Sequence, residues 1–172
     1  MQSMVSMLDL ARRIPVLSHL SEQQGLDLSP HWQKCQFEKG QVMARQGFVP
    51  SQVFFLLAGR ARVLRMDRSG REFILYKVQI GDPVEAASVI DGEPNSATVV
   101  AETRTDVLAL DKRVFMHCVY HNGALAHAFM RHMAHRVRQQ EGRIATLVLL
   151  DVKGRVCRAL IDQAVPTDDA HW

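Results

Sequence analysis

The chain has 172 residues, of which 47% are hydrophobic and 23% are charged. This length accommodates one domain of about 100–150 residues with a helical extension, and the composition is typical of a soluble globular protein. No apolar run reaches the roughly 18 residues of a membrane span, and the first residues lack the basic and apolar segments of a secretory signal. We therefore expect a cytoplasmic protein without a membrane partner. The net charge of +3 does not decide the class of partner, because a solvated basic helix face explains it as well as nucleic-acid binding does.

The N-terminal segment favours two short helices. Apolar residues recur at helical spacing over 4–14, namely at Met4, Met7, Leu8, Ala11 and Ile14, and Pro15 ends the pattern. A second helix is expected to begin at Ser21, with Glu22 in its first turn.

Residues 32–110 have the pattern of a β-structure. Short runs rich in Val, Phe, Leu and Ile, such as VFFLLAGRARVLR, are separated by turn signals about ten residues apart. These turns are Lys39-Gly40, Gln46-Gly47, Ala58-Gly59, Ser69-Gly70, Ile80-Gly81 and Asp91-Gly92. Short, regularly spaced strands predict an antiparallel jelly-roll β-roll, also called a double-stranded β-helix, within an α+β chain.

A change of period after Asp111 predicts two further helices. Residues 111–120 form a short helix, and Asn122 is a suitable N-cap for a long one over 123–150. The long helix carries an apolar stripe, which predicts a dimer interface at Met130, Met133, Val137, Ile144 and Val148. The simpler alternative is a helix packed only on its own β-roll. We favour a coiled coil in a homodimer, because the helix is longer than a roll of this size can cover.

In this order, the motifs of the chain resemble those of the catabolite-activator/anaerobic-regulator (Crp/Fnr) family of bacterial transcription factors. The resembling segments are LARRIPVLSHLSEQ, FEKGQVMARQG, VFFLLAGRARVLR, GREFILYKVQIGD and LLDVKGRVCRAL, spread over nearly the whole chain. The resemblance implies a cyclic-nucleotide-binding-like β-roll with N-terminal helices over 1–120, a dimerisation helix over 121–150, and a hinge with the first helix of a DNA-binding domain over 151–172.

The segment after Asp151 is too short for a complete DNA-binding domain. A helix-turn-helix needs two more helices than this segment offers, so DNA binding is expected only through a part that the chain lacks. The chain is then the sensing part of an allosteric transcription regulator, and whether it is a piece of a longer protein or a natural short form stays open. The runner-up function is a free-standing module of the same fold that regulates a protein partner.

The resemblance places a phosphate-binding cassette in GDPVEAASVIDGEPNSAT, residues 81–98. In the family, a cyclic phosphate meets backbone N–H groups at a helix start and an arginine, while a glutamate accepts a hydrogen bond from the ribose. Here Glu85 stands at the position of the family's glycine, Ala86 at that of the glutamate and Asn95 at that of the arginine. We predict a degenerate cassette with the candidate ligand contacts Glu85, Ala86, Ala87, Asn95, Ser96 and Ala97, joined by Gln140 and Glu141, which interrupt the apolar stripe of the long helix.

Three interpretations of the cassette stay open. Cyclic-nucleotide binding is retained if Glu85 reaches the ribose, or if Arg45 or Arg104 replaces the missing arginine. Alternatively, a different small molecule binds in the same cavity, or the roll is empty and serves only as a dimer scaffold. Loss of the charged partner costs a buried phosphate roughly 2–5 kcal/mol, so we expect no binding of cAMP or cGMP at signalling concentrations.

The sequence shows no signature of an enzyme or a metal site. It has no G-x-S-x-G motif and no Walker loop, and residues 36–110 contain no histidine that could serve a metal-dependent roll. His117 and His121 lie four residues apart, as helical metal ligands can, but we interpret them as solvated or interface residues. Haem ligation by a histidine, as in the family's gas sensors, is the alternative.

The three cysteines are Cys35, Cys118 and Cys157, and their spacing fits reduced thiols better than a disulfide framework or an iron–sulfur cluster. We assign no metal and no certain cofactor, and expect at most a small effector in the roll.

Overall fold

The computed structural model of the chain describes residues 9–12, 14–67 and 69–163. It has two compact units, Met1–Phe129 and Met130–Trp172, whose boundary falls within the long helix. Residues 9–12 are helical, while Met4, Met7 and Leu8 of the first expected helix lie outside the described residues. The domain limits at 120 and 150 stay a prediction.

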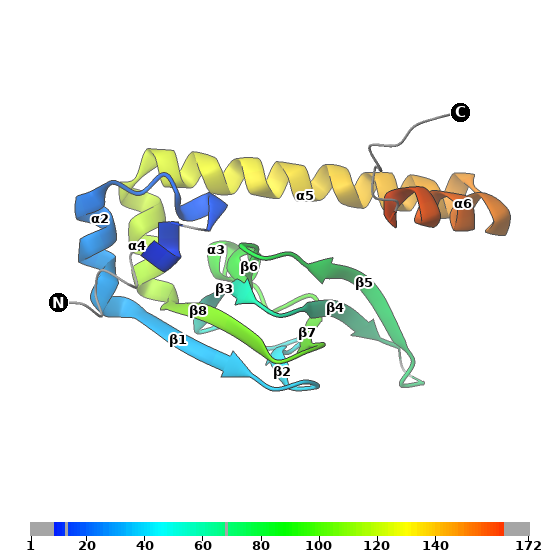
Figure 1. The fold of residues 1–172 in the computed structure, drawn as a ribbon, viewed down its shortest axis with the longest axis horizontal. Helices are drawn as coiled ribbons and strands as arrows, with labels where there is room; N and C mark the ends of the chain where they lie inside the picture. The colour runs from blue at the N-terminus through cyan, green and yellow to red at the C-terminus, as the bar shows by residue number, and fades with distance from the viewer. Residues whose placement is uncertain (1–8, 13, 68, 164–172) are drawn as a thin grey trace, which may run out of the picture. The chain divides into compact units, whose positions relative to one another are not determined.

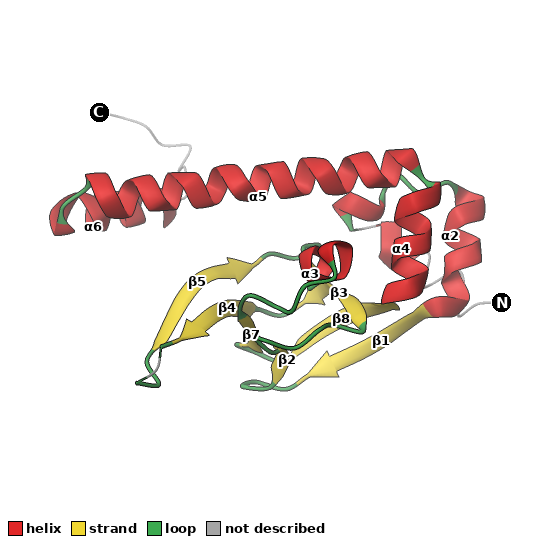
Figure 2. Cartoon of the chain, turned by 180° about the vertical axis from the view of Figure 1, so that it is seen from behind, coloured by secondary structure: helices red, strands yellow, loops and turns green. Residues whose placement is uncertain are grey.

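Two four-stranded antiparallel sheets form the β-roll of the first unit (Figures 1 and 2). One sheet has the strand order β1 (Trp32–Phe37), β8 (Thr105–Asp111), β3 (Gln52–Ala58) and β6 (Pro83–Val84). The other has the order β2 (Val42–Ala44), β7 (Thr98–Ala101), β4 (Ala61–Met66) and β5 (Glu72–Val78). The predicted antiparallel jelly roll within an α+β chain is confirmed.

The helices follow the expected order along the chain. The described elements are η1 (Pro15–Leu17), α2 (Glu22–Leu28), η2 (Ser29–His31), α3 (Ala86–Asp91), α4 (Lys112–His121), α5 (Gly123–Leu149) and α6 (Val152–Gln163). The helix starts predicted near residues 21, 111 and 123 are therefore confirmed to within one or two residues.

The turn glycines lie where the backbone needs them. All six glycines named in the turn prediction have positive φ, from 77° to 90°. At Gly59 a second constraint applies, because a Cβ there would collide with the carbonyl oxygen of Arg104 and lie 2.7 Å from the Cα of Thr105. The turn between β3 and β4 therefore packs directly on the backbone that leads into β8, and only glycine fits there.

Two apolar clusters form the core, and β3 contributes to both. Phe55 belongs to the cluster between the first sheet and the helices, where its ring makes edge-to-face contacts with Trp32 at 5.7 Å and Phe129 at 6.5 Å. Leu56 belongs to the cluster between the two sheets, together with Val107. Because successive side chains on a strand point to opposite faces, β3 is buried on both sides and holds the helical layer and the second sheet together.

Candidate ligand-binding site

Glu85 is the residue at which the structure departs most from ordinary backbone geometry. It precedes α3 with φ 68° and ψ −3°, and it is the only non-glycine residue with positive φ among the described residues. A left-handed conformation costs a residue with a Cβ roughly 1–2 kcal/mol, which explains the glycine at this position in the family that the sequence resembles. A left-handed residue therefore precedes α3, and that this segment keeps the backbone form of a phosphate cassette stays a prediction.

The side chains at two of the substituted cassette positions bond to each other. The Nδ2 of Asn95 donates a hydrogen bond to Oε1 of Glu85 at 2.7 Å and a longer one to the carbonyl oxygen of Arg45 at 3.4 Å. Asn95 is only 7% exposed, and its backbone N–H and C=O pair with Phe48 and Gly47 of the β2–β3 loop. Asn95 therefore joins Glu85 to this loop, and its buried amide lies at the position where the resemblance predicts an arginine.

The carboxyl of Glu85 is electrostatically unfavourable for an anion. Its partial burial raises its pKa above the ordinary value of 4.5, while the hydrogen bond from Asn95 acts in the opposite direction. An anionic phosphate placed beside this group would meet a partly desolvated carboxylate instead of a cation.

The small residues of the cassette divide between core and surface. Ala86 is 2% exposed and belongs to the apolar cluster between the first sheet and the helices, next to Val89. Ala97 is also buried, in the cluster between the sheets, whereas Ala87 and Ser96 are exposed. Ala87 and Ser96 are thus the exposed pair among these four small residues.

A cavity of 310 Å³ lies beside the cassette, and Glu85 is the one predicted contact that lines it. Its other lining residues come from β2, the β2–β3 loop and β3: Met43, Ala44, Arg45, Phe48, Val49, Pro50, Ser51, Gln52 and Phe54. Of the two arginines considered as substitutes, Arg45 reaches this cavity and Arg104 does not line it. Sequence reasoning missed Phe48 and Val49, although two large apolar residues directly after a Gln-Gly turn are a usable signal of such a site.

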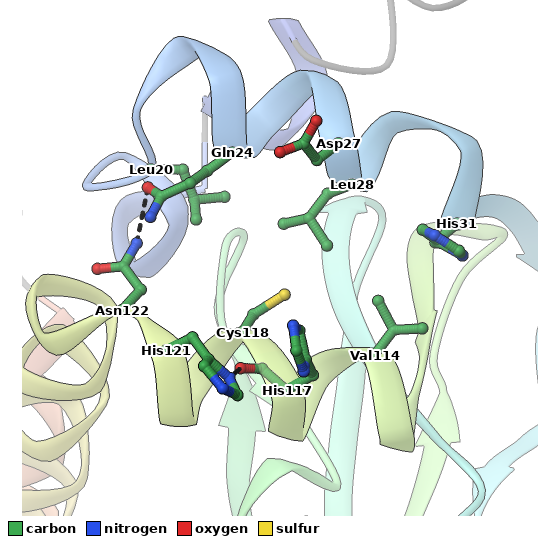
Figure 3. A pocket seen from close by; sticks show the side chains of 10 residues that line it. All are labelled: Leu20, Gln24, Asp27, Leu28, His31, Val114, His117, Cys118, His121 and Asn122. Atoms are coloured by element: carbon green, nitrogen blue, oxygen red, sulfur yellow. Dashed lines mark hydrogen bonds between the residues drawn. The ribbon is translucent and has the colours of Figure 1, made fainter.

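A second cavity, also of 310 Å³, lies between α2 and α4 (Figure 3). His117 and His121 line it with ring centroids 4.1 Å apart, and Nδ1 of His121 lies 2.8 Å from the carbonyl oxygen of His117. The thiol of Cys118 also lines it, and burial raises the pKa of this thiol. No cluster of three or more His, Cys, Asp or Glu residues suited to a metal ion occurs among the described residues.

The remaining predicted contacts lie in the second unit. Gln140 and Glu141 lie in α5, as do all five residues of the predicted dimer stripe. On that stripe Met130, Val137, Ile144 and Val148 are exposed, while Met133 is half-buried. A ligand contact for the first pair and a dimer contact for the stripe both stay predictions.

A model of the cyclic nucleotide-binding domain family matches residues 34–122, from β1 to the residue after α4. The chain belongs to this family. The roll is therefore a cyclic nucleotide-binding domain in fold and descent, and the resemblance to Crp/Fnr regulators is confirmed.

Curated relatives of this domain are transcription regulators. The CRP-like cAMP-activated global transcriptional regulator of Mycobacterium tuberculosis is 22% identical over 137 residues, which cover 80% of this chain and 61% of that protein. The cAMP-activated global transcriptional regulator CRP of Salmonella typhimurium is 27% identical over 128 residues, covering 74% of this chain and 61% of that protein. The chain thus spans less than two thirds of the length of these two relatives.

Solved structures with the same fold come from two functional settings. The sensor domain of the transcriptional regulator DNR from Pseudomonas aeruginosa has a TM-score of 0.70 at 21% identity, covering 83% of this chain and 95% of that one. The regulatory subunit of a cAMP-independent protein kinase A from Trypanosoma brucei has a TM-score of 0.67 at 25% identity, covering 76% of this chain and 47% of that one. These homologues are regulators and regulatory subunits. In the described part of the chain, no helix is both long and apolar enough to span a bilayer.

Proposed function

We propose that the chain is the ligand-sensing and dimerisation domain of a Crp/Fnr-type bacterial transcription regulator whose cassette no longer binds cyclic nucleotides. The observation that carries this proposal is the hydrogen bond between Asn95 and Glu85. It occupies the positions at which the family's arginine and glycine would receive the phosphate. The curated relatives, which are regulators of this type, support the same assignment.

The expected loss of affinity for a cyclic nucleotide follows from charge. Replacing a buried cation that pairs with a phosphate by a neutral amide costs about 2–5 kcal/mol, or roughly 30-fold to several thousand-fold in affinity. The partly buried carboxylate of Glu85 adds repulsion, and Ala86 offers no acceptor to a ribose hydroxyl. One solved structure with this fold is the regulatory subunit of a cAMP-independent protein kinase A from Trypanosoma brucei, which is compatible with the proposed loss.

Calorimetry of the chain with cAMP and cGMP tests the loss of binding. We expect no micromolar dissociation constant for the unaltered protein. The triple variant E85G/A86E/N95R restores the family's residues and should raise the affinity at least about 100-fold. The variant E85G/N95Q, which relieves the backbone strain but restores neither charged group, is the matched control. Because Ala86 is buried, a thermal melt of each variant must accompany the titration. Micromolar binding by the unaltered chain would contradict the proposal.

Signal transmission would pass through the helices of the second unit. The break between α5 and α6 at Leu150-Asp151 is a suitable hinge, since the carboxylate of Asp151 accepts a hydrogen bond from the N–H of Gly154 at 2.8 Å and starts α6 anew. In the whole protein, a ligand in the roll would shift the pairing of two α5 helices and thereby the spacing of two DNA-reading units.

The second candidate is a module that regulates a protein partner, and the likeness to regulatory subunits of protein kinase A favours it. The coding sequence discriminates between the two functions. Continuation beyond Trp172 into a helix-turn-helix supports the transcription regulator, whereas a stop at that point supports the module.

A further inference from the structure

The cavity beside Glu85 combines two opposite charges with apolar walls. Glu85 and Arg45 are the ionisable residues in its lining, while Met43, Phe48 and Phe54 contribute apolar surface. Its 310 Å³ lies at the small end of the range of about 300–1,000 Å³ that is usual for small-molecule sites. The occupant should therefore be a small molecule.

The position of the Glu85 carboxylate is unfavourable in free energy for two reasons. The residue occupies a left-handed conformation in which glycine would be unstrained, and its carboxyl is partly withdrawn from water. Such costs persist mainly where a residue serves a function, so the outlier points to a role for this side chain. Asn95 bonds to Oε1, and an ionised carboxylate can accept several more hydrogen bonds.

The β2–β3 loop side of the cavity presents a cation and uncovered apolar surface. Phe48 and Val49 are 62% and 56% exposed, and the guanidinium carbon of Arg45 lies 5.7 Å from the centre of the Phe48 ring. Arg45 itself is exposed and therefore available to an incoming anion. A ligand that covered Phe48 and Val49 would remove this apolar surface from water.

We propose that this cavity binds a free amino acid with an apolar side chain, whose ammonium group pairs with Glu85 and whose carboxylate pairs with Arg45. The inference rests on the proposed sensing function and names the class of its effector. An ammonium group is favoured over a hydroxyl because hydrogen bonds between charged groups are stronger, and a partly desolvated carboxylate gains most from them. A monocarboxylate is favoured over a phosphate because only one guanidinium lines the cavity, opposite a carboxylate.

Calorimetry of the 172-residue chain with three matched probes tests the proposal. L-Leucine carries both charges, isopentylamine lacks the carboxylate, and 4-methylpentanoate lacks the amine. We expect saturable binding of L-leucine and at least about tenfold weaker binding of either half-ligand, the scale of one lost charge-assisted hydrogen bond. E85Q, which keeps the acceptor for Asn95, should weaken L-leucine at least about tenfold and leave 4-methylpentanoate unchanged. R45M should weaken L-leucine similarly and leave isopentylamine unchanged.

The controls are E102Q and R104M, which remove the same charges at positions that do not line the cavity. Both should bind L-leucine as the unaltered chain does. Absence of saturable L-leucine binding, or equal losses in the cavity variants and the controls, would overturn the inference.

Parallel titrations with cAMP and sedimentation of the same samples distinguish failure of the amino-acid inference from failure of the proposed sensing function. A dimer that binds neither cAMP nor L-leucine contradicts the amino-acid inference and leaves the proposed sensing domain standing. Micromolar cAMP binding that R45M abolishes contradicts both, because the cavity would then be a relocated nucleotide site.

Discussion

Asn122 and Gln24 join two helix starts that lie 98 residues apart in the chain. The Nδ2 of Asn122 donates to Oε1 of Gln24 at 2.8 Å (Figure 3). The Oδ1 of Asn122 accepts from the N–H of Leu125 in the first turn of α5. The same Oε1 of Gln24 accepts from the N–H of Ser21 and completes the capping box of α2. One amide thus caps α5 and ties it to the start of α2.

Replacement of Asn122 should expose both roles. We expect N122A to lower the free energy of unfolding by about 1–2 kcal/mol because the cap is lost. Loss of the hydrogen bond to Gln24 should add to this decrease. N122S keeps a capping oxygen but cannot reach across to Gln24, so its loss should be smaller. Urea denaturation of both variants measures the two terms, and equal losses would contradict a separate contribution from the cap.

Gly59 provides a test of close backbone packing. G59A should destabilise the roll by more than about 2 kcal/mol, because it adds a steric collision with Arg104 and Thr105 to the strain of a positive φ. Gly40 is the matched control, since it has φ +87° and nothing within 4 Å of its added Cβ. G40A should therefore cost only the strain, roughly 1 kcal/mol. Similar denaturation midpoints for the two variants would contradict this prediction, because they would show that the turn at Gly59 moves away from Arg104 and Thr105 without a cost in stability.

The partly buried Glu85 should make the folded state less stable as the pH rises. Burial raises its pKa above 4.5, so the folded state binds this proton more tightly than the unfolded state does. Its stabilising contribution is then fully present below pH 4.5 and is lost as the pH rises through the raised folded-state pKa. The glutamine of E85Q does not titrate. The melting temperature of E85Q should therefore rise relative to that of the unaltered chain as the pH increases from about 4 to 8.

Asp67 serves as the control of opposite sign. Hydrogen bonds, first of all from the hydroxyl of Ser69, lower the pKa of Asp67 from 3.8 to about 2. Its contribution is present above pH 3.8 and is lost as the pH falls towards 2, so the difference between D67N and the unaltered chain should shrink over that interval. A pH dependence of the same sign in E85Q and D67N would contradict the assignment for Glu85.

Local signals explain how much of the fold could be predicted. The turn at Ala58-Gly59 and the caps at Ser21 and Asn122 can be predicted from a few adjacent residues, because left-handed turns and helix starts depend on local backbone geometry. The regular spacing of the turns predicts short strands, but the pairing of β3 with β8 and β6 joins segments that are not neighbours in the chain and that turn spacing does not encode. The resemblance to Crp/Fnr regulators supplied the rest of the topology.

The site was less accessible to sequence reasoning. The substitutions at Glu85 and Asn95 were visible, but their mutual hydrogen bond was not, because it depends on the side-chain directions across ten residues of chain. Phe48 and Glu85 also line the same cavity from different loops, an arrangement that no spacing rule encodes. Ala86 was expected to face a ligand, yet it is packed in the core cluster with Val89; its role as a ligand contact stays a prediction.

The apolar stripe of α5 leads to the last prediction, which concerns the dimer. Val137 and Ile144 are 57% and 59% exposed and lie seven residues apart, the spacing of a coiled-coil seam. Two identical chains can bury this stripe in an isologous contact. V137E would then place two carboxylates at the seam, and we expect sedimentation velocity at tens of micromolar to show a dimer for the unaltered chain and a monomer for V137E. Q139E adds the same charge two residues away, off the stripe, and should remain dimeric. An unaltered chain that sediments as a monomer, or a V137E variant that stays dimeric, would remove the basis for the dimerisation helix.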